Sequence, residues 1–352
     1  MNEWEKKLRA IDPYIPGEQP DFADMIKLNT NENPYPPAPA VAEKLKELSA
    51  AKLALYPSTN ANLLTEELSK LYHIEKDRIF VGVGSDDVLG TIFQTCFCSE
   101  EPILFPDITY SFYDVWADLF RIPYRQIPLK EDFTIAKEDY YGKNGGVVIA
   151  NPNAPTSIGM GVSEIEDIVK HNPNSVVVVD EAYVDFGGET AFPLLERYDN
   201  LLVVQTFSKS RSMAGMRIGY AFGSKKLIEA IYAVRNSYNS YTMNYPSIVC
   251  GAESLKDTAY FNETVAKVVA TRERTKRELS KLGFSFPDSK TNFLFATHES
   301  VPAEEIFKML REKHIFVRYW KKPRIDNRLR ITIGTDEQMD RLFAVLKEYL
   351  SK

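Results

Sequence analysis

Lys209 and Asp180 have the residue types and surroundings that chemistry with an aldehyde cofactor requires. Lys209 lies in the segment Thr206–Ser210, Arg217 follows eight residues later, and Asp180 closes a run of four valines. A lysine amine forms a Schiff base with an aldehyde, and an aspartate can keep a pyridine nitrogen protonated. Arg217 can take a phosphate group as a bidentate anion. Together these residue types suggest an enzyme that uses pyridoxal 5'-phosphate (PLP).

Each of these residues also has an ordinary explanation. Most lysines are solvated surface charges, and an aspartate after a strand is often a turn or cap residue. Asp180 is the more informative one, because the valines at 176–179 indicate a strand that is covered on both faces. Ligands in α/β sheets collect at the carboxyl ends of such strands.

Other predicted strands also end in residues that could bind a ligand. The strand at 78–83 runs into Gly84-Ser85-Asp86 and a helical pattern, where free backbone N–H groups favour an anion. Tyr110 follows the strand at 103–106 and could stack on a ring. The strand at 147–150 ends in a turn that is rich in asparagine and proline. Taken singly, each signal is equally typical of caps, packing and turns.

Elements that could position these residues alternate along the first two thirds of the chain. Helical patterns such as Glu164–Lys170 and Lys226–Arg235 separate the strand candidates. This alternation predicts a mainly parallel sheet with helices on both faces. The strand candidates are 78–83, 102–106, 147–151, 175–180, 201–206 and 217–222.

The pattern changes after residue 235. A long amphipathic segment spans Tyr260–Leu282, a strand is predicted at 291–296, and two further helices are predicted at Ala303–Lys313 and Asp336–Leu350. This region reads as a smaller α+β domain.

Composition limits the classes of function. The 352 residues suggest two domains, and 44% apolar residues suffice for sizeable cores. No window approaches the roughly 18 apolar residues of a membrane span, and the first residues lack the apolar core of a signal peptide. Three cysteines and four scattered histidines indicate neither a disulfide framework nor a metal site. We therefore expect a cytoplasmic protein without a metal.

The charge of the chain argues against two kinds of partner. A net charge of -6 does not suit a nucleic-acid surface, which needs clustered excess cation. The short basic run Lys321–Arg324 reads as a solvated loop rather than a polyanion site. We expect small-molecule substrates, and no nucleic acid or membrane partner.

In their order along the chain, the motifs resemble those of a known family. Any one of them is weak, but the ordered set is specific, and it covers nearly the whole chain. The chain resembles the fold-type-I PLP aminotransferases of class I and II, and within them the histidinol-phosphate aminotransferases. The matching segments are Asp12–Tyr14, Leu28–Pro34, Tyr56–Pro57, Gly84–Asp86, Tyr110, Asn151–Ser157, Asp180–Tyr183, Ser208–Lys209 and Leu329–Thr335.

The resemblance implies a role for each site residue. Lys209 would hold the cofactor covalently, and Asp180 would pair with its ring nitrogen. Tyr183 would form a hydrogen bond with its phenolic oxygen. Tyr110 would stack on the ring. The cofactor phosphate would be held by Ser85, Asp86 (through its backbone amide), Thr206, Ser208, Arg217 and, from the neighbouring subunit of a homodimer, Tyr56.

One turn departs from the family pattern. The family has an asparagine directly before the second proline and a glycine after the threonine, where this chain has Ala154 and Ser157. The asparagine that touches the phenolic oxygen is therefore missing at its own position. Asn153, one residue earlier, is the candidate to replace it.

The resemblance also implies a fold and a substrate. The fold would have a large, mainly parallel, seven-stranded-type sheet domain at 36–235, with a smaller domain built from 1–35 and 236–352. The reaction would be transamination of L-histidinol phosphate with 2-oxoglutarate, giving imidazole acetol phosphate and glutamate, in histidine biosynthesis. The substrate-binding residues would be Arg330 as the main anion clamp, Arg318 as a second one, and Tyr14 and Asn31.

Three alternatives share the cofactor residues. A threonine-phosphate decarboxylase would also need a phosphate clamp, and an aromatic-amino-acid aminotransferase would need an aromatic pocket. A PLP-binding transcription regulator would need a DNA-binding domain, for which this sequence offers no basic recognition helix.

Overall fold

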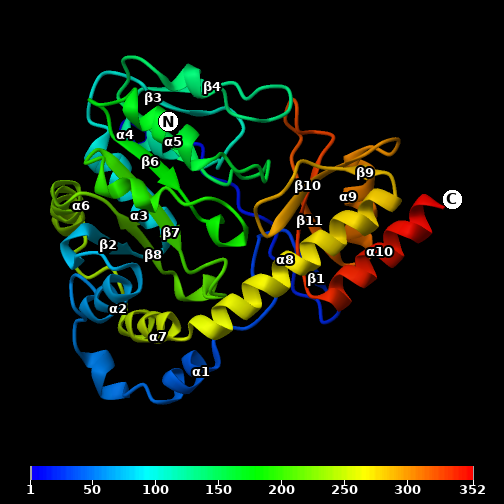
Figure 1. Cartoon of the computed structure of the whole chain (residues 1–352), viewed down its shortest axis with the longest axis horizontal. Helices are drawn as coiled ribbons and strands as arrows, with labels where there is room; N and C mark the ends of the chain where they lie inside the picture. Colours follow the sequence, from blue (N-terminus) through cyan, green and yellow to red (C-terminus); the bar gives the residue numbers. More distant parts are fainter. Residues whose placement is uncertain (1, 352) are drawn as a thin grey trace.

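The computed structural model describes residues 2–351. Two sheets, each with its own helices, lie on either side of the molecule, and the long helix α8 (Thr258–Lys281) runs from one to the other (Figure 1). The large sheet lies among the cyan and green elements, and the small one among the orange and red elements.

The large sheet has seven strands in the order β2-β8-β7-β6-β5-β3-β4. All neighbouring strands are parallel except β8, which runs antiparallel to both β2 and β7. The prediction of a mainly parallel sheet is therefore confirmed. The strands are β2 (Ile79–Gly82), β3 (Ile103–Pro106), β4 (Tyr124–Ile127), β5 (Gly146–Ala150), β6 (Val177–Asp180), β7 (Leu201–Thr206) and β8 (Gly219–Phe222).

Helices cover both faces of this sheet, because its strands are apolar on both sides. Along β6, Val178 packs into one core while Val177 and Val179 pack into the other. The helices on the first face are α3 (Gly84–Cys96), α4 (Tyr113–Phe120) and α6 (Lys225–Tyr238). Those on the second are α1 (Pro39–Lys46), α2 (Asn62–Tyr72), α5 (Val162–Lys170) and α7 (Tyr245–Lys256).

Helix α7 lies after the domain boundary that we expect at residue 235, yet it packs on the large sheet's side. Its residues Ile248, Cys250 and Leu255 belong to the same core as Val41 of α1 and Leu64 of α2. The change of element pattern near residue 235 therefore does not coincide with the end of the large core.

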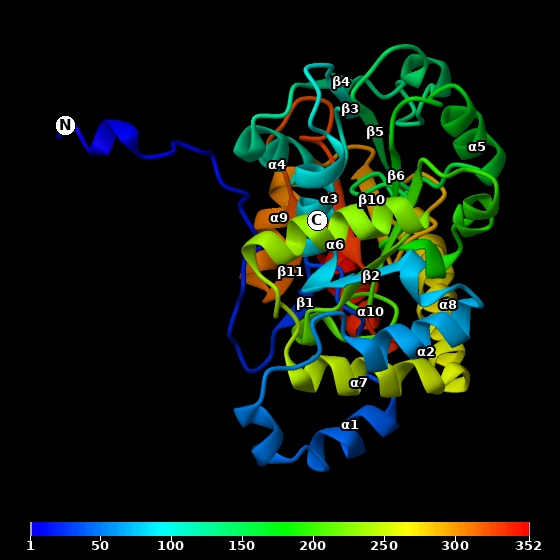
Figure 2. The same cartoon turned by 90° about the vertical axis from the view of Figure 1, so that its left-hand side faces the viewer.

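The small sheet has five strands in the order β1-β11-β12-β10-β9. Its edge strand β1 comes from the N-terminal segment and pairs parallel with β11, so both ends of the chain build this sheet. Figure 2 shows the blue N-terminal segment before β1 running outward from the body of the molecule. The elements are β1 (Ile26–Leu28), β9 (Phe284–Ser285), β10 (Phe293–His298), β11 (Ile315–Tyr319), β12 (Leu329–Thr332), α9 (Ala303–Glu312) and α10 (Asp336–Leu350).

The described residues lack both a membrane-spanning helix and a metal-binding cluster. Among residues 2–351, no helix is both long and apolar enough to cross a membrane. The same residues contain no group of three or more His, Cys, Asp or Glu side chains that could hold a metal ion.

Candidate active site

A cavity of about 210 Å³ lies where several strands of the large sheet end. Side chains reach it from the end of β6, from the first turn of α3, from the loop between β7 and β8, and from the N-terminal segment. It is lined by Thr30, Glu32, Ser85, Asp86, Tyr110, Ala150, Pro152, Ala154, Asp180, Ala182, Tyr183, Ser208, Lys209, Ala214 and Arg217. Eight of the residues predicted to bind the cofactor are thus brought to one cavity.

Lys209 is held from the N-terminal segment. Its Nζ donates a hydrogen bond of 3.1 Å to the carbonyl of Thr30 and lies 5.7 Å from the centre of the Tyr183 ring. The Asn33 side chain donates to the carbonyls of Lys209 and Ser210, at 3.1 and 3.2 Å. These contacts fix the backbone at Lys209 while its amine faces the cavity.

Asp180 is a buried carboxylate at the base of the cavity. Its Oδ2 accepts a hydrogen bond of 2.8 Å from the Tyr113 hydroxyl, and its Oδ1 accepts one of 3.2 Å from the Ala182 N–H. Burial raises the pKa of Asp180 to about 6, although the Tyr113 hydrogen bond lowers it. No cationic side chain among the described residues forms an ion pair with it. A cationic ring nitrogen would supply the missing partner.

Donors for an anion converge at the other end of the cavity. Arg217 lies with NH1 3.5 Å from Ser208 Oγ and NH2 3.2 Å from Asp86 Oδ2. Ser85 and Asp86 are in the first turn of α3, where free N–H groups and the helix dipole attract negative charge. A Cβ added at Gly219 would lie 2.3 Å from the Ser85 nitrogen, so only glycine lets β8 approach this helix start.

Thr206 supports this end from behind the cavity lining. Its Oγ1 donates to Ser208 Oγ at 3.0 Å and accepts from the Ser208 N–H at 3.1 Å. Thr206 thereby orients Ser208, and the cavity itself is lined by Ser208.

A second pocket, of about 360 Å³, adjoins the first, and Tyr110 and Ala154 line both. Tyr14 lines it and stacks on Phe112, with ring centroids 4.2 Å apart. Arg330 and Trp320 line it from the small-domain side. The second pocket therefore has aromatic walls and a cation, next to Lys209.

One N–H group of the Arg330 guanidinium has no hydrogen-bond acceptor. Its NH2 donates 2.7 Å to the Asn29 carbonyl, but its Nε is buried and has no hydrogen-bond partner. Burial lowers its pKa, and the Phe293 and Trp320 rings lie 5.4 and 5.2 Å from the guanidinium. An orphaned guanidinium nitrogen beside a pocket is a ready partner for an anionic ligand.

Arg318 is beside Arg330 in the small sheet but is used differently. The two residues pair across β11 and β12. The Arg318 guanidinium donates to the carbonyls of Pro16 and Ile15, at 3.1 and 3.0 Å, and does not line either pocket. In this structure Arg318 therefore fastens the N-terminal segment.

Besides Thr206 and Arg318, three more predicted residues lie outside both pockets. The Asn153 amide is occupied by Thr109, Thr156 and the Ile108 carbonyl, while Ala154 lines the cavity. Asn31 is buried behind Tyr183. Tyr56 is 81% exposed and stacks on Tyr241, with centroids 4.5 Å apart; it does not line the chain's own cavity.

Sequence reasoning missed the partners that hold the site residues. Tyr113 follows Tyr110 by three residues at the start of α4, a spacing that hints at a shared side of a helix. Thr30, Glu32 and Asn33 lie in the matched segment Leu28–Pro34, but nothing in their types shows that they reach Lys209. Nothing in the sequence around Trp320 indicated that it would line the second pocket.

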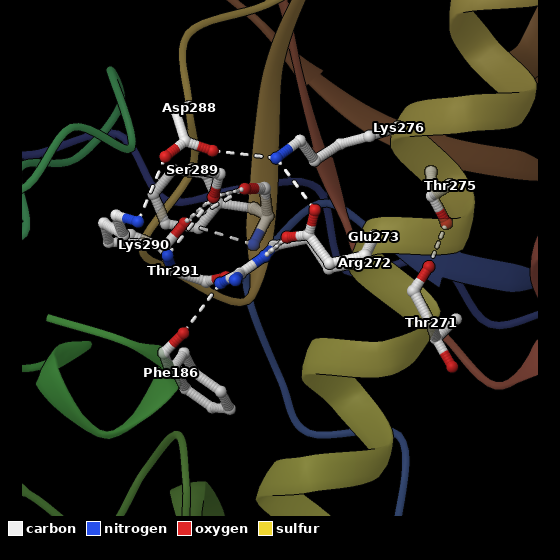
Figure 3. A network of polar contacts seen from close by, with 11 residues as sticks. Phe186, Thr271, Arg272, Glu273, Thr275, Lys276, Asp288, Ser289, Lys290 and Thr291 are labelled. Atoms are coloured by element: carbon white, nitrogen blue, oxygen red, sulfur yellow. Dashed lines mark hydrogen bonds and ion pairs between the residues drawn. The ribbon is translucent and has the colours of Figure 1, made fainter.

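Helix α8 fastens the segment before β10 to the loop that follows β6 (Figure 3). Arg272 donates to the Phe186 carbonyl at 2.7 Å and to the Thr291 carbonyl at 2.9 Å. Asp288 accepts from Lys276 at 2.8 Å and pairs with Lys290 at 3.0 Å. Lys290 in turn donates its backbone N–H to the Ser157 carbonyl, at 2.9 Å. The segment is thus tied to the turn beside the cavity.

The donor set matches the parts of PLP. The cavity offers an amine for an aldehyde, a buried carboxylate without a cation for a ring nitrogen, and an arginine with a helix start for a phosphate. The residues present therefore fit this cofactor.

Comparison with known proteins agrees with the geometry. The family described as aminotransferase class I and II matches residues 23–346. Histidinol-phosphate aminotransferase from Lactococcus lactis subsp. cremoris (strain MG1363) is 51% identical over 99% of this chain and 98% of its own length. The protein of the same name from Acinetobacter baylyi is 49% identical over 100% of this chain and 98% of its own.

A solved structure shows the same fold. Histidinol-phosphate aminotransferase from Sinorhizobium meliloti, in complex with pyridoxal-5'-phosphate, superposes with a TM-score of 0.83 over 93% of this chain and 91% of its own. The sequence identity is 22%, so this likeness concerns the fold alone.

Proposed function

The chain belongs to the class I and II aminotransferases, and on that premise we propose that it transfers the amino group of L-histidinol phosphate to 2-oxoglutarate with PLP as cofactor. The products are imidazole acetol phosphate and glutamate, in histidine biosynthesis. Identities of about 50% over nearly the full length to several histidinol-phosphate aminotransferases support this substrate.

One structural observation carries the proposal. The Lys209 cavity adjoins a pocket that contains Arg330, whose Nε is buried without a partner. A substrate that has an amine for the first and an anionic group for the second satisfies both. Histidinol phosphate has a phosphate and glutamate a carboxylate, so the same guanidinium can serve both halves of the reaction.

Lys209 and Asp180 perform the proton chemistry. When bound, PLP supplies an aldehyde that reacts with amines and a ring that takes up the electrons released at the substrate carbon. Once the substrate amine has displaced it from the cofactor, the freed Lys209 Nζ would take the proton from the substrate carbon and deliver it to the cofactor carbon that receives the amino group. The Asp180 carboxylate holds the ring nitrogen in its protonated form, and Tyr113 holds Asp180.

Other residues orient the cofactor. Arg217, Ser208, Ser85 and the Asp86 amide bind its phosphate, with Thr206 behind Ser208. Tyr183 would donate to its ring oxygen, and Tyr110 would pack on its ring. Ala154 supplies no polar group, and the role expected of Asn153 would require its amide to leave Thr109 and Thr156.

The remaining predicted residues serve the substrate pocket, two of them from its lining and two from behind it. Arg330 takes the phosphate, Tyr14 forms part of the aromatic wall, and Arg318 shapes the pocket by fastening the segment that carries Tyr14. Asn31 lies behind Tyr183 and supports the site through that residue.

We further propose a cytoplasmic homodimer in which Tyr56 reaches the partner's cofactor phosphate. An 81% exposed tyrosine stacked on Tyr241 is consistent with a residue that serves another subunit. Mixing Tyr56→Ala and Lys209→Ala subunits tests this, because one site of each mixed dimer retains both residues. Recovered activity supports the dimer, and an active monomer in light scattering contradicts it.

A panel of amino donors tests the reaction. Purified protein with PLP and 2-oxoglutarate should convert histidinol phosphate much faster than histidinol or phenylalanine, because a charge-assisted hydrogen bond is worth about 1.5–3 kcal/mol. Preference for phenylalanine would favour an aromatic-amino-acid aminotransferase. Release of carbon dioxide from threonine phosphate would favour the decarboxylase.

A further inference from the structure

All four polar groups of Asn31 have partners. Its Nδ2 donates 2.8 Å to the Tyr183 hydroxyl oxygen, and its Oδ1 accepts 3.0 Å from the Thr332 hydroxyl. Its N–H donates 3.1 Å to Thr332 Oγ1, and its carbonyl accepts 2.9 Å from Asn292 Nδ2. Asn31 is 1% exposed and has φ +58°, a left-handed conformation that asparagine tolerates better than most residues.

The Asn31 amide is oriented with its oxygen toward Thr332 and its NH₂ group toward Tyr183. The Thr332 hydroxyl has a single proton and gives it to Oδ1. The NH₂ group points to Tyr183, whose oxygen accepts it. The small domain supplies both anchors, from β12 and from the segment before β10.

The Tyr183 hydroxyl is consequently left as a donor. Its oxygen is occupied by Asn31, and within residues 2–351 its proton has no acceptor. Tyr183 lines the cavity with Lys209, and no amide side chain lines that cavity. A ligand oxygen in the cavity would accept a hydrogen bond from the Tyr183 hydroxyl.

We propose that Asn31 is a positioning residue that fixes Tyr183 as a hydrogen-bond donor toward the ring oxygen of bound PLP. The inference rests on the proposed function and assigns Asn31 a role different from substrate binding. Asn31 touches neither substrate nor cofactor, and acts only through the direction in which it makes the Tyr183 proton point.

Asn31→Asp tests this in the full-length, PLP-loaded protein. A carboxylate is nearly isosteric with the amide and tolerates the same backbone, but it can only accept, so Tyr183 must turn its proton away from the cavity. A donor at the ring oxygen stabilises the cofactor form with fewer protons. The pH midpoint of the cofactor's visible absorption should therefore rise by about 1 pH unit in Asn31→Asp.

A double-mutant cycle separates this from the charge of the new carboxylate. In a Tyr183→Phe background, Asn31→Asp should move the midpoint no further, because no hydroxyl remains to be turned. An equal shift in both backgrounds, or none in either, would overturn the inference. If Asn31→Asp does not fold, Asn31→Ala should give a smaller rise that also disappears in Tyr183→Phe.

Two further readouts complete the test. Asn172→Asp, which places a carboxylate at another buried asparagine remote from the cavity, should leave the midpoint unchanged. If the protein transaminates normally but Asn31→Asp shifts the pH midpoint equally with and without the Tyr183 hydroxyl, only the role of Asn31 is refuted. A chain that takes up no PLP refutes the proposed function itself.

Discussion

The hydroxyl of Tyr113 donates a hydrogen bond of 2.8 Å to Oδ2 of Asp180, with both groups buried at the base of the cavity. Tyr113 begins α4, and Asp180 ends β6. This contact connects the aromatic core beneath α4 to the carboxylate on which the proposed chemistry depends, because it keeps Asp180 more acidic than burial alone would allow.

Tyr113→Phe should therefore reduce catalysis more than it reduces cofactor binding. Loss of a hydrogen bond to a charged group costs about 1.5–3 kcal/mol, so we expect kcat to fall at least about tenfold. Steady-state kinetics on PLP-loaded protein measure this. Tyr140→Phe is a matched control, because the Tyr140 hydroxyl is equally buried but has no partner, and that variant should keep wild-type activity.

The contribution of Asp180 to the stability of the cofactor-free protein should fall as pH rises from about 4 to about 6. Burial raises the pKa of Asp180 to about 6 from 3.8, so the folded state binds this proton more tightly than the unfolded chain. The contribution of Asp180 is full below the unfolded pKa and is lost as pH passes through the folded one, a change of roughly 2–3 kcal/mol.

Urea unfolding of wild type and Asp180→Asn across this range checks the prediction. Relative to Asp180→Asn, wild type should lose this stability as pH rises, whereas Glu181, whose pKa burial raises to about 7, contributes equally to both proteins. The exposed control Asp199→Asn should behave like wild type. Identical slopes in wild type and Asp180→Asn would contradict the assignment.

Ser157→Gly should stabilise the protein by about 1 kcal/mol. Ser157 has φ +66°, and its buried hydroxyl has no hydrogen-bond partner. Glycine removes both the left-handed strain and the orphaned hydroxyl, at some cost in unfolded-state entropy. Ser157→Ala, which removes only the hydroxyl, should gain less in urea unfolding. A loss of stability in Ser157→Gly would show that the hydroxyl has a partner after all.

Arg272→Met should destabilise the protein by about 3 kcal/mol. Arg272 is buried, and its loss would leave the Phe186 and Thr291 carbonyls without a donor (Figure 3). Arg274→Met, on a more exposed part of the same helix, should cost less than about 1 kcal/mol. Similar unfolding free energies for the two variants would contradict this role for Arg272.

The sequence predicted the fold well where patterns are local. The valine run that ends at Asp180 is a fully buried strand, as its continuous apolar character indicates. Strand β4 (Tyr124–Ile127) was missed, because it lies at the edge of the sheet and its middle residues are exposed. The antiparallel course of β8 had no signal in its own residues, since direction depends on the connection before it.

The candidate site was predictable in its residues but not in their contacts. Lys209, Asp180, Tyr183 and Arg217 come together because parallel strands end at one edge of the sheet. The partners of these residues lie up to about 180 positions away along the chain, as with Lys209 and Thr30. Such pairs carry no periodic signal, so only the folded structure reveals them.

The proposed function requires Lys209 to hold PLP covalently. Borohydride reduction of the PLP-loaded protein, followed by peptide mass spectrometry, tests it directly, because reduction makes the lysine–cofactor bond permanent. We predict that the cofactor mass is found on the peptide that contains Lys209. Cofactor on another lysine, such as Lys27 or Lys290, or no labelled peptide at all, would contradict this assignment.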